Sequence, residues 1–465
     1  MAAIDCESGE GGVVSNDLLA QAIQRAGWSN KGLALRIQTR ADRLGIKISC
    51  THINVGRWLK GGGIRPRTAA VVAEVFSEAF GELVTPEALG FVSESGVLLP
   101  LSFSEDLPET LRGLASTAEH DIADSVELQK AAATSVAWTA PLMAWLLGRP
   151  EPLQTSPTGR RVGMPEVAAI CSTIKLFMQL DFQFGGGHAR SALAQYFRHD
   201  VLPLLDGTYS EAVGRKLFSA AAEAAQLLGW TAYDLGRHGL AQRYFVQGLR
   251  LAQAGDDRVM GGRLLSNMSH QANYLGFFSE AAQLARAAQE GARGAATPTV
   301  TAMFLAMEAR ARAGAGDGRN CAIALREAEQ LFDKRVLCED PPWIEYFDDA
   351  ELAGEAAHCF RDLRNPGLAV EFVSRAIELT DPGYVRTHAF IRLVHAVSCL
   401  HGDAADIEQA AEIAIKAIEL AGPLKSERYL RYIRDLYVDF MPHRRNADVT
   451  RALAVFDGAL SAVPS

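Results

Sequence analysis

A short basic segment near the N-terminus holds the residues whose types and spacing best fit a defined chemistry. Between positions 25 and 67 the chain carries ten Lys or Arg residues and one acid, Asp42, although the whole protein has a net charge of −9. Asn54 and Arg57 are of the residue types that form paired hydrogen bonds with adenine and guanine edges, and the surrounding cations could neutralise DNA phosphates. The expected DNA-contacting residues are Lys31, Arg36, Arg40, Arg43, Lys47, Thr51, His52, Asn54, Arg57, Lys60, Arg65 and Arg67.

Four short helices are expected to position these side chains. Apolar spacing and glycine stops predict helices over 15–26, from 29 or 30 to about 44, over 51–59 and over 66–80. The third helix combines polar positions with an apolar face and ends at Gly61, which resembles the end of a phage-repressor-like helix-turn-helix. The long span 39–49 is interpreted as an extended second helix whose cations touch phosphates. A solvated basic face, or a helical hairpin used in protein contacts, is the alternative.

The second half of the chain repeats itself. The turn glycines Gly236, Gly276 and Gly316 are spaced by 40 residues, and each is followed five positions later by a small residue. The string Ala-Ile-Glu-Leu occurs at 376–379 and again at 417–420. This periodicity predicts an α-solenoid of stacked helical hairpins, similar to tetratricopeptide repeats, whose usual period is about 34 residues. An insertion at 333–346 separates the third and fourth copies, and we expect a kinked connection there or, alternatively, a loop that docks a partner.

The first helix of each repeat is expected to line a concave groove. Its side chains mix aromatic, amide and cationic groups, which suit a peptide backbone and a carboxylate. The predicted groove residues are Gln226, Trp230, Tyr233, Arg263, Asn267, His270, Asn273, Arg310, His358, Arg361, Arg392 and His395. An exposed His270 would titrate near neutral pH. The alternative is a solvated groove without a ligand, or one filled by another part of the chain.

Composition bounds the class of protein. A chain of 465 residues with 48% hydrophobic residues is long enough for two or three domains. Seven dispersed cysteines without a C-x-x-C pair predict reduced thiols rather than disulfides or a zinc site. The N-terminus lacks the features of a signal peptide, and no apolar run approaches the roughly 18 residues that cross a bilayer. We expect a soluble, cytoplasmic protein.

Sites for enzymatic chemistry find little support in the sequence. The segment Gly185–Arg190 resembles a phosphate cradle, but it lacks the Lys-Ser/Thr pair of a P-loop and no strand precedes it. We expect a tight turn between helices instead. No metal-ligand spacing and no nucleophile with an orienting partner stand out. The prediction is therefore a protein that is not an enzyme and that uses no metal or cofactor.

Six strings of this sequence resemble parts of known proteins: Val55–Gly61, Gly185–Arg190, Gly229–Asp234, Leu235–Tyr244, Met268–Ala272 and Asp340–Trp343. They are similar to strings of the streptomycete regulators with an N-terminal helix-turn-helix and a C-terminal tetratricopeptide region. The resemblance covers most of the chain. It implies a cytoplasmic transcriptional regulator of morphological differentiation and antibiotic production, often a repressor. More distantly, the architecture is similar to the peptide-responsive quorum-sensing regulators of Gram-positive bacteria, from which this chain departs by a long linker and divergent repeats.

Together these observations predict an all-α protein with five parts. We expect a disordered N-terminus at 1–14, a helix-turn-helix domain at 15–92, a linker with a helical segment at 93–162, a tetratricopeptide-like repeat domain at 163–440, and a capping helix and tail at 441–465. We predict a homodimeric regulator that binds double-stranded DNA and is therefore associated with the nucleoid when bound. Its groove is expected to bind a peptide, small-molecule or protein effector. The alternative is a scaffold that sequesters another regulator and has little DNA binding of its own.

Overall fold

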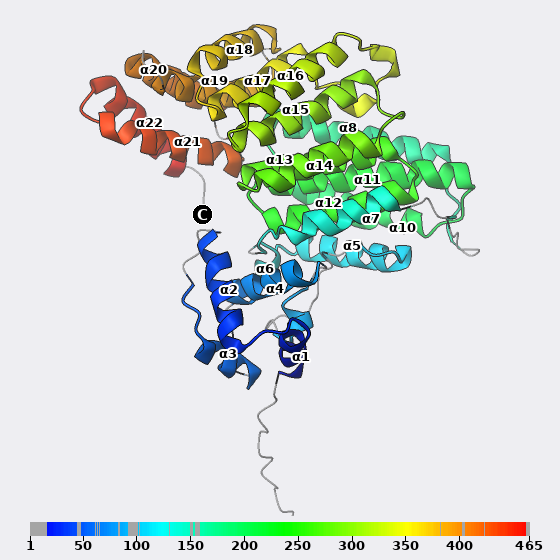
Figure 1. The fold of residues 1–465 in the computed structure, drawn as a ribbon. Helices are drawn as coiled ribbons and strands as arrows, with labels where there is room; N and C mark the ends of the chain where they lie inside the picture. Colours follow the sequence, from blue (N-terminus) through cyan, green and yellow to red (C-terminus); the bar gives the residue numbers. More distant parts are fainter. Residues whose placement is uncertain are drawn as a thin grey trace, which may run out of the picture. The chain divides into compact units, whose positions relative to one another are not determined.

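The structure is a computed structural model with side chains (Figure 1). It describes residues 16–43, 48–60, 62, 64, 66–81, 84–91, 101, 103–129, 131–148, 152–153, 159–381, 383–401, 405–422 and 424–461. These ranges are helical and contain no strand; an isolated bridge joins Arg161 to Thr208. The all-α prediction is confirmed, whereas the expected disorder at 1–14 lies outside the described residues. The chain divides into two compact units, Met1–Leu98 and Leu99–Ser465.

The first unit contains the four predicted helices. They are α1 (Asp17–Arg25), α2 (Asn30–Arg43), α3 (His52–Leu59) and α4 (Pro66–Phe80), followed by the 3₁₀ turn η1 (Glu87–Leu89). The Asn16 side chain caps α1 by accepting the Leu19 N–H at 3.0 Å, which satisfies one of the donors that a helix N-terminus leaves open. Val55 and Trp58 of α3 are buried in one apolar core with α1, α2 and α4.

The second unit begins with helices that precede the repeats. They are α5 (Leu107–Ile122), α6 (Val126–Gln129), α7 (Val136–Leu147), α8 (Met164–Phe184), α9 (Arg190–Tyr196), the π-helical turn η2 (Phe197–Val201) and α10 (Leu202–Leu205). We expected α5–α7 to belong to a linker. Instead, Trp138 and Trp145 are almost wholly buried in the same core as the repeat helices. Because two indole rings bury a large apolar area, this segment belongs to the second unit.

Adjacent helices then pack in pairs, an arrangement consistent with an α-solenoid. The pairs are α11 (Glu211–Asp234) with α12 (His238–Ala254), α13 (Arg258–Tyr274) with α14 (Phe278–Gly291), α15 (Pro298–Gly314) with α16 (Gly318–Phe332), α17 (Asp349–Asp362) with α18 (Pro366–Leu379), and α19 (Val385–Leu400) with α20 (Ile407–Ala421). The 3₁₀ turns η3 (Leu337–Glu339) and η4 (Pro342–Ile344) separate the third and fourth pairs. The chain continues through α21 (Glu427–Phe440), η5 (Met441–His443) and α22 (Ala447–Ser461).

The 40-residue period corresponds to the turns within the first three pairs. Gly236, Gly276 and Gly316 all have positive φ angles, between 74° and 84°, which favour glycine over residues with a Cβ. The small residues five positions later are completely buried between paired helices: Ala241, Ala281 and Cys321. The periodicity of the sequence therefore reports both the tight turn and the close approach of two helices.

One buried carboxylate connects the first repeat helix with the C-terminal helices. Asp234, at the end of α11, has no exposed surface. It accepts the Gly186 N–H at 3.2 Å, the Ser426 hydroxyl at 2.9 Å and the Arg386 guanidinium at 2.5 Å, and Arg428 lies 3.7 Å away. The predicted turn Gly185–Arg190 thus joins α8 to α9 and gives one of its N–H groups to this carboxylate.

We predict that Asp234→Asn destabilises the protein by about 3 kcal/mol, because the variant loses the buried charge that pairs with Arg386 and Arg428 and leaves Arg428 without its carboxylate partner. Unfolding by guanidinium chloride, followed by circular dichroism, measures the change. Asp457→Asn on α22 is the matched control, since that side chain is exposed and should leave the free energy of unfolding unchanged. Equal stability of the two variants would contradict the structural role of Asp234.

Candidate functional site

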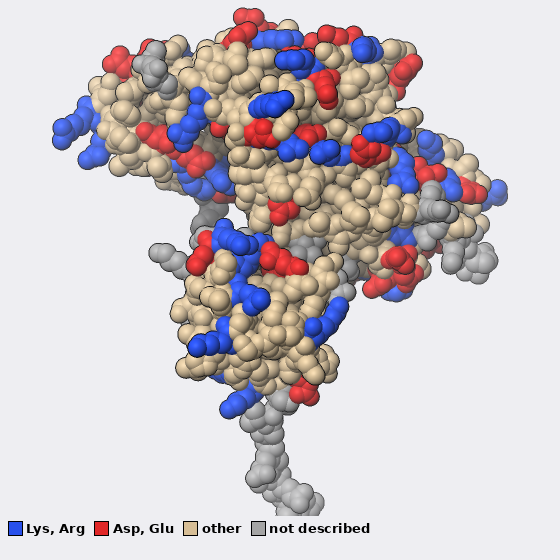
Figure 2. Space-filling view, viewed as in Figure 1, with Lys and Arg blue, Asp and Glu red and all other residues tan. Residues whose placement is uncertain are grey.

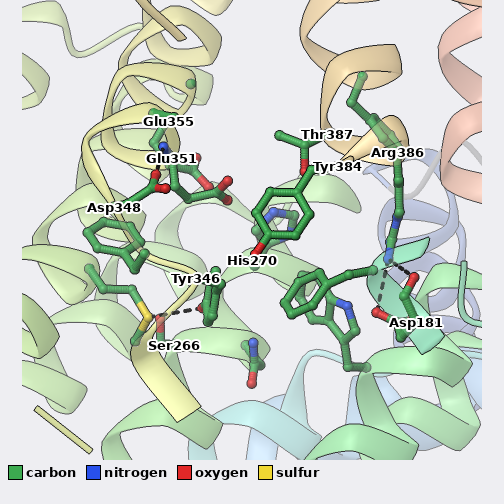
Figure 3. Close-up of a pocket in the computed structure, with 18 of the residues that line it drawn as sticks. Asp181, Ser266, His270, Tyr346, Asp348, Glu351, Glu355, Tyr384, Arg386 and Thr387 are labelled. Atoms are coloured by element: carbon green, nitrogen blue, oxygen red, sulfur yellow. Dashed lines mark hydrogen bonds and ion pairs between the residues drawn. The ribbon is translucent and has the colours of Figure 1, made fainter. Parts of the chain in front are cut away.

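A pocket opens between the first helices of the repeats and the C-terminal helices of the second unit (Figure 3). Its cavity volume is about 180 Å³. Side chains from α8, α11, α13, α15, α17, α19 and α21 line it, together with the segment that precedes α17. The repeats bring these positions together because each first helix presents the same face to the concave side of the stack.

Seven of the twelve predicted groove residues line this pocket. They share a position on the first helix of a repeat, where successive turns place side chains three or four residues apart on one face. The seven are Gln226, Trp230, Arg263, Asn267, His270, Arg310 and His358. Two of them are joined directly, because the Gln226 amide donates to the Asn267 side chain at 2.8 Å.

The other five predicted groove residues lie outside the pocket lining. Tyr233 is fully buried, and its hydroxyl hydrogen-bonds the His270 Nδ1 at 2.9 Å, so it positions a lining residue instead. Arg361 pairs with its neighbour Asp362 and lies over the Tyr432 ring. The side chains of Tyr233 and Arg361 thus contact other residues of the protein and do not line the cavity. The remaining three, absent from the lining, are Asn273, Arg392 and His395.

Sequence reasoning missed most of the residues that complete the pocket. Helix α8 contributes Asp181 and Phe182, although it precedes the repeats. The last residue of the insertion, Tyr346, and the next residue, Phe347, also line the pocket, so this connection helps to form the wall. One signal was present: Asp348, Glu351 and Glu355 are three and four residues apart, as acids on a single helix face must be. The missed residues from the C-terminal helices include Tyr384, Arg386, Phe390 and Arg428.

Every arginine that lines the pocket has a carboxylate partner within the protein. Buried ion pairs of this kind hold both charges in place, because separating them would leave one charge without compensation. The partners come from different helices, so the pairs also fix the walls relative to one another. The pairs are Arg263 with Glu223 at 3.6 Å, Arg310 with Glu355 at 2.5 Å, Arg386 with Asp181 at 3.0 Å, and Arg428 with Asp234 at 3.7 Å.

The acidic wall, defined as Asp348, Glu351 and Glu355, stands opposite Arg386 and Asp181 in the cavity (Figure 3). Glu355 is paired with an arginine, whereas among the described residues neither Asp348 nor Glu351 forms an ion pair. Asp348 caps α17 by accepting the Glu351 N–H at 2.9 Å. Burial, reinforced by repulsion from Glu355 and Asp348, raises the pKa of Glu351 from 4.5 to about 8.

The two histidines of the pocket stay neutral near pH 7. Burial lowers the pKa of His270 well below its ordinary value, and the charges of Arg428 and Arg310 lower it further. Burial and the same neighbouring Arg310 also lower the pKa of His358. The expectation that His270 titrates near neutral pH is therefore wrong, because it assumed an exposed imidazole.

In the first unit, most of the predicted DNA-contacting residues that the structure describes are exposed, and some of them also contact other parts of the protein. Figure 2 shows basic side chains on the visible face of this unit. Six of the predicted cations or potential cations are described and exposed: Lys31, Arg36, Arg43, His52, Arg57 and Lys60. The guanidinium of Arg36 lies 4.5 Å from the centre of the Trp28 ring. Lys47, Arg65 and the side chain of Arg67 lie outside the described residues.

Two of these residues form contacts within the protein that reduce their availability for DNA binding. Arg40 bonds Glu74 at 2.9 Å and Glu78 at 2.8 Å, which joins α2 to α4, so it is not an open phosphate contact. The Asn54 oxygen accepts both the N–H and the hydroxyl of Thr51, at 2.9 Å and 2.8 Å, to cap α3. This capping occupies the same Asn54 oxygen that would accept a hydrogen bond from a base, so capping and base recognition compete for it.

Other kinds of site receive no support from the described part of the chain. No cluster of three or more His, Cys, Asp or Glu residues there could hold a metal ion. None of the helices that the structure describes is long and apolar enough to span a bilayer. The cysteines in these ranges are all free, and Cys321 and Cys359 are buried.

We predict that Glu351→Gln stabilises the protein increasingly as the pH rises. Between about pH 4.5 and 8 the folded protein holds a proton on Glu351 that the unfolded chain has released, so raising the pH across this window lowers the stability of the wild type. Glutamine carries no charge at any pH and removes this loss. Thermal unfolding at pH 5.5, 7 and 8.5 measures it, with Glu371→Gln on the exposed face of α18 as control. A stability difference independent of pH would contradict the elevated pKa.

Comparisons with known proteins bear on the first unit alone. The family model described as the SP15 N-terminal domain matches residues 19–92, which run from α1 to just beyond η1. No curated protein and no solved structure matches the chain. The chain is therefore similar to the SP15 N-terminal domain over less than a fifth of its length.

Proposed function

We propose that this protein is a transcriptional regulator that binds double-stranded DNA through its first unit and an effector through the pocket of its second unit. By resemblance to the streptomycete regulators, it acts in the cytoplasm and represses genes of differentiation and antibiotic production. It acts as a homodimer, because helix-turn-helix proteins usually bind two symmetric half-sites. The proposal treats α2 and α3 as a helix-turn-helix and the paired helices as tetratricopeptide-like repeats. No catalytic step, metal or cofactor is part of it.

The observation that carries the proposal is the two-sided character of α3. Its Val55 and Trp58 are buried in the core of the first unit, whereas His52, Arg57 and Lys60 are exposed. A helix whose apolar face is fixed and whose polar face carries cations has the form needed to enter the major groove of DNA. Lys31 and Arg43 of α2 add exposed positive charge for phosphate contacts.

The pocket supports the second half of the proposal. It lies in a unit separate from the basic one, and it combines aromatic walls with buried charged groups, as sites for small ligands commonly do. A ligand that binds one arrangement of the α17, α19 and α21 walls more tightly than another would shift the population of that arrangement. Such a shift is the physical requirement for an effector that alters DNA binding.

The competing function is an interaction scaffold that sequesters another regulator. The capping role of Asn54 and the internal pairing of Arg40 favour it, since both reduce the number of side chains open to DNA. The two functions differ in whether the purified protein binds DNA by itself.

We predict that the double variant Arg57→Ala, Lys60→Ala binds genomic DNA fragments at least about tenfold more weakly at low salt, because it loses a base-edge or phosphate donor and a phosphate contact. Fluorescence anisotropy of labelled fragments measures the affinity, and the dependence on salt should become shallower by about one unit per lost contact. Arg286→Ala is the control, since its exposed guanidinium lies on α14 of the second unit.

Binding by the double variant that equals the wild type would show that α3 is not the recognition helix. No DNA binding by the wild-type protein at any salt concentration would instead favour the scaffold. Circular dichroism of each variant checks that the helices remain folded.

A further inference from the structure

The pocket has hydrogen-bond acceptors that the protein leaves without donors. Gln226 is 3% exposed, and its side-chain oxygen has no hydrogen-bond partner among the described residues. Asp181 is 4% exposed, and one of its carboxylate oxygens, Oδ1, is likewise unpartnered in that part of the chain. Both residues line the cavity. Three lining arginines also have nitrogens without a hydrogen-bond acceptor among the described residues: Nη1 of Arg263, Nε of Arg310 and Nε of Arg428. Because a buried polar atom without a partner is costly, a ligand that carries N–H or O–H groups would satisfy the two open acceptors, and the charges of the lining decide the sign of the ligand.

The charges of the lining favour a positive ligand. The four arginines are already paired with carboxylates, and Arg428 also lies over the rings of Trp230, Tyr233 and Phe390, at 4.9–5.3 Å. The acidic wall has the opposite balance. Within the described residues, neither Asp348 nor Glu351 has a cationic partner. An added cation would therefore stabilise the charged forms of these acids on one face of α17, whereas the same acids would repel an anion.

The remaining walls are aromatic and suit an organic cation rather than a metal ion. The rings of Phe182 and Tyr346 lie 5.7 Å apart, and those of Phe182 and Tyr384 lie 6.2 Å apart. Met303 also lines the cavity, within hydrogen-bond distance of the Tyr346 hydroxyl. Aromatic faces attract ammonium and guanidinium groups and pack against the carbon atoms attached to them. Hard metal ions prefer a shell of oxygen ligands.

We propose that the pocket binds an organic cation, a protonated amine or a guanidinium on a short apolar body, with its charge at Glu351 and Asp348 and its body between the aromatic walls. This inference rests on the proposed function, because it names the chemical class of the effector. A small amine and the basic side chain of a peptide share this chemistry. Gln226 and Asp181 accept hydrogen bonds from the ligand's remaining donors.

Three probes of one shape and different charge test the inference: 3-phenylpropylamine, 3-phenylpropanol and 3-phenylpropionate. Isothermal titration calorimetry with the full-length protein at pH 8.5 measures their affinities while the amine is still protonated. We expect the amine to bind at least about tenfold more tightly than the alcohol, and the carboxylate to bind most weakly. Equal binding of the three probes, no binding of the amine, or tightest binding of the carboxylate would overturn the inference.

Variants locate the charge within the pocket. Glu351→Gln and Asp348→Asn should each weaken amine binding at least about tenfold and leave the binding of the alcohol unchanged. Asparagine retains the capping oxygen of Asp348, so that variant separates charge from folding. Glu371→Gln on α18 is the control and should bind the amine as the wild type does. Amine binding that is unchanged in both pocket variants would contradict the assigned position.

A further arm distinguishes the two sources of the cation and separates this inference from the proposed function. N-acetyl-lysine amide that binds more tightly than 3-phenylpropylamine identifies a peptide side chain, and the reverse order identifies a small amine; either order supports an organic cation. DNA binding is measured independently by anisotropy. Amine binding without DNA binding would contradict the regulator and leave the cation site intact. DNA binding without amine binding would contradict the cation site alone.

Discussion

The second unit depends on the buried carboxylate of Asp234, because this one group holds segments from distant parts of the chain. It accepts hydrogen bonds from the turn after α8, from Ser426 before α21 and from Arg386 of α19. A linear stack of repeats has contacts only between neighbours. The ion pairs of Asp234 add a connection from the first repeat to the C-terminal helices, and the pocket lies between the parts that they join.

The same connections explain the uneven charge of the pocket. Arg386 and Arg428 can line the cavity because Asp234 and Asp181 neutralise their charges. The acidic wall of α17 has one such partner, Arg310, for three acids. Burial then raises the pKa of Glu351 to about 8. A group held away from its usual protonation state by its surroundings is a common mark of a functional site, and here it coincides with a cavity.

Local signals in the sequence predicted much of this structure. Turn glycines and small residues at a fixed spacing predicted the pairs of helices. The expected faces of the first helices predicted that Gln226, Asn267 and His270 line one groove, and all three line the pocket. Contacts between distant elements were beyond such signals. The residues near Arg40 do not indicate that it pairs with Glu74. The repeat pattern does not indicate that α8 lines the pocket. Tryptophan is a residue type that commonly packs in a core, but no local signal indicates that Trp138 and Trp145 of α7 pack in the same core as the repeat helices.

We propose that α3 of the first unit recognises DNA and that the pocket of the second unit binds an effector. The central claim of this proposal is that the protein binds DNA at defined sites. Chromatin immunoprecipitation with sequencing, for the wild type and for the Arg57→Ala, Lys60→Ala variant, tests this claim most directly. The account predicts discrete, palindrome-like peaks for the wild type that disappear in the variant. No discrete peaks for the wild type, or the same peaks for both proteins, would contradict it.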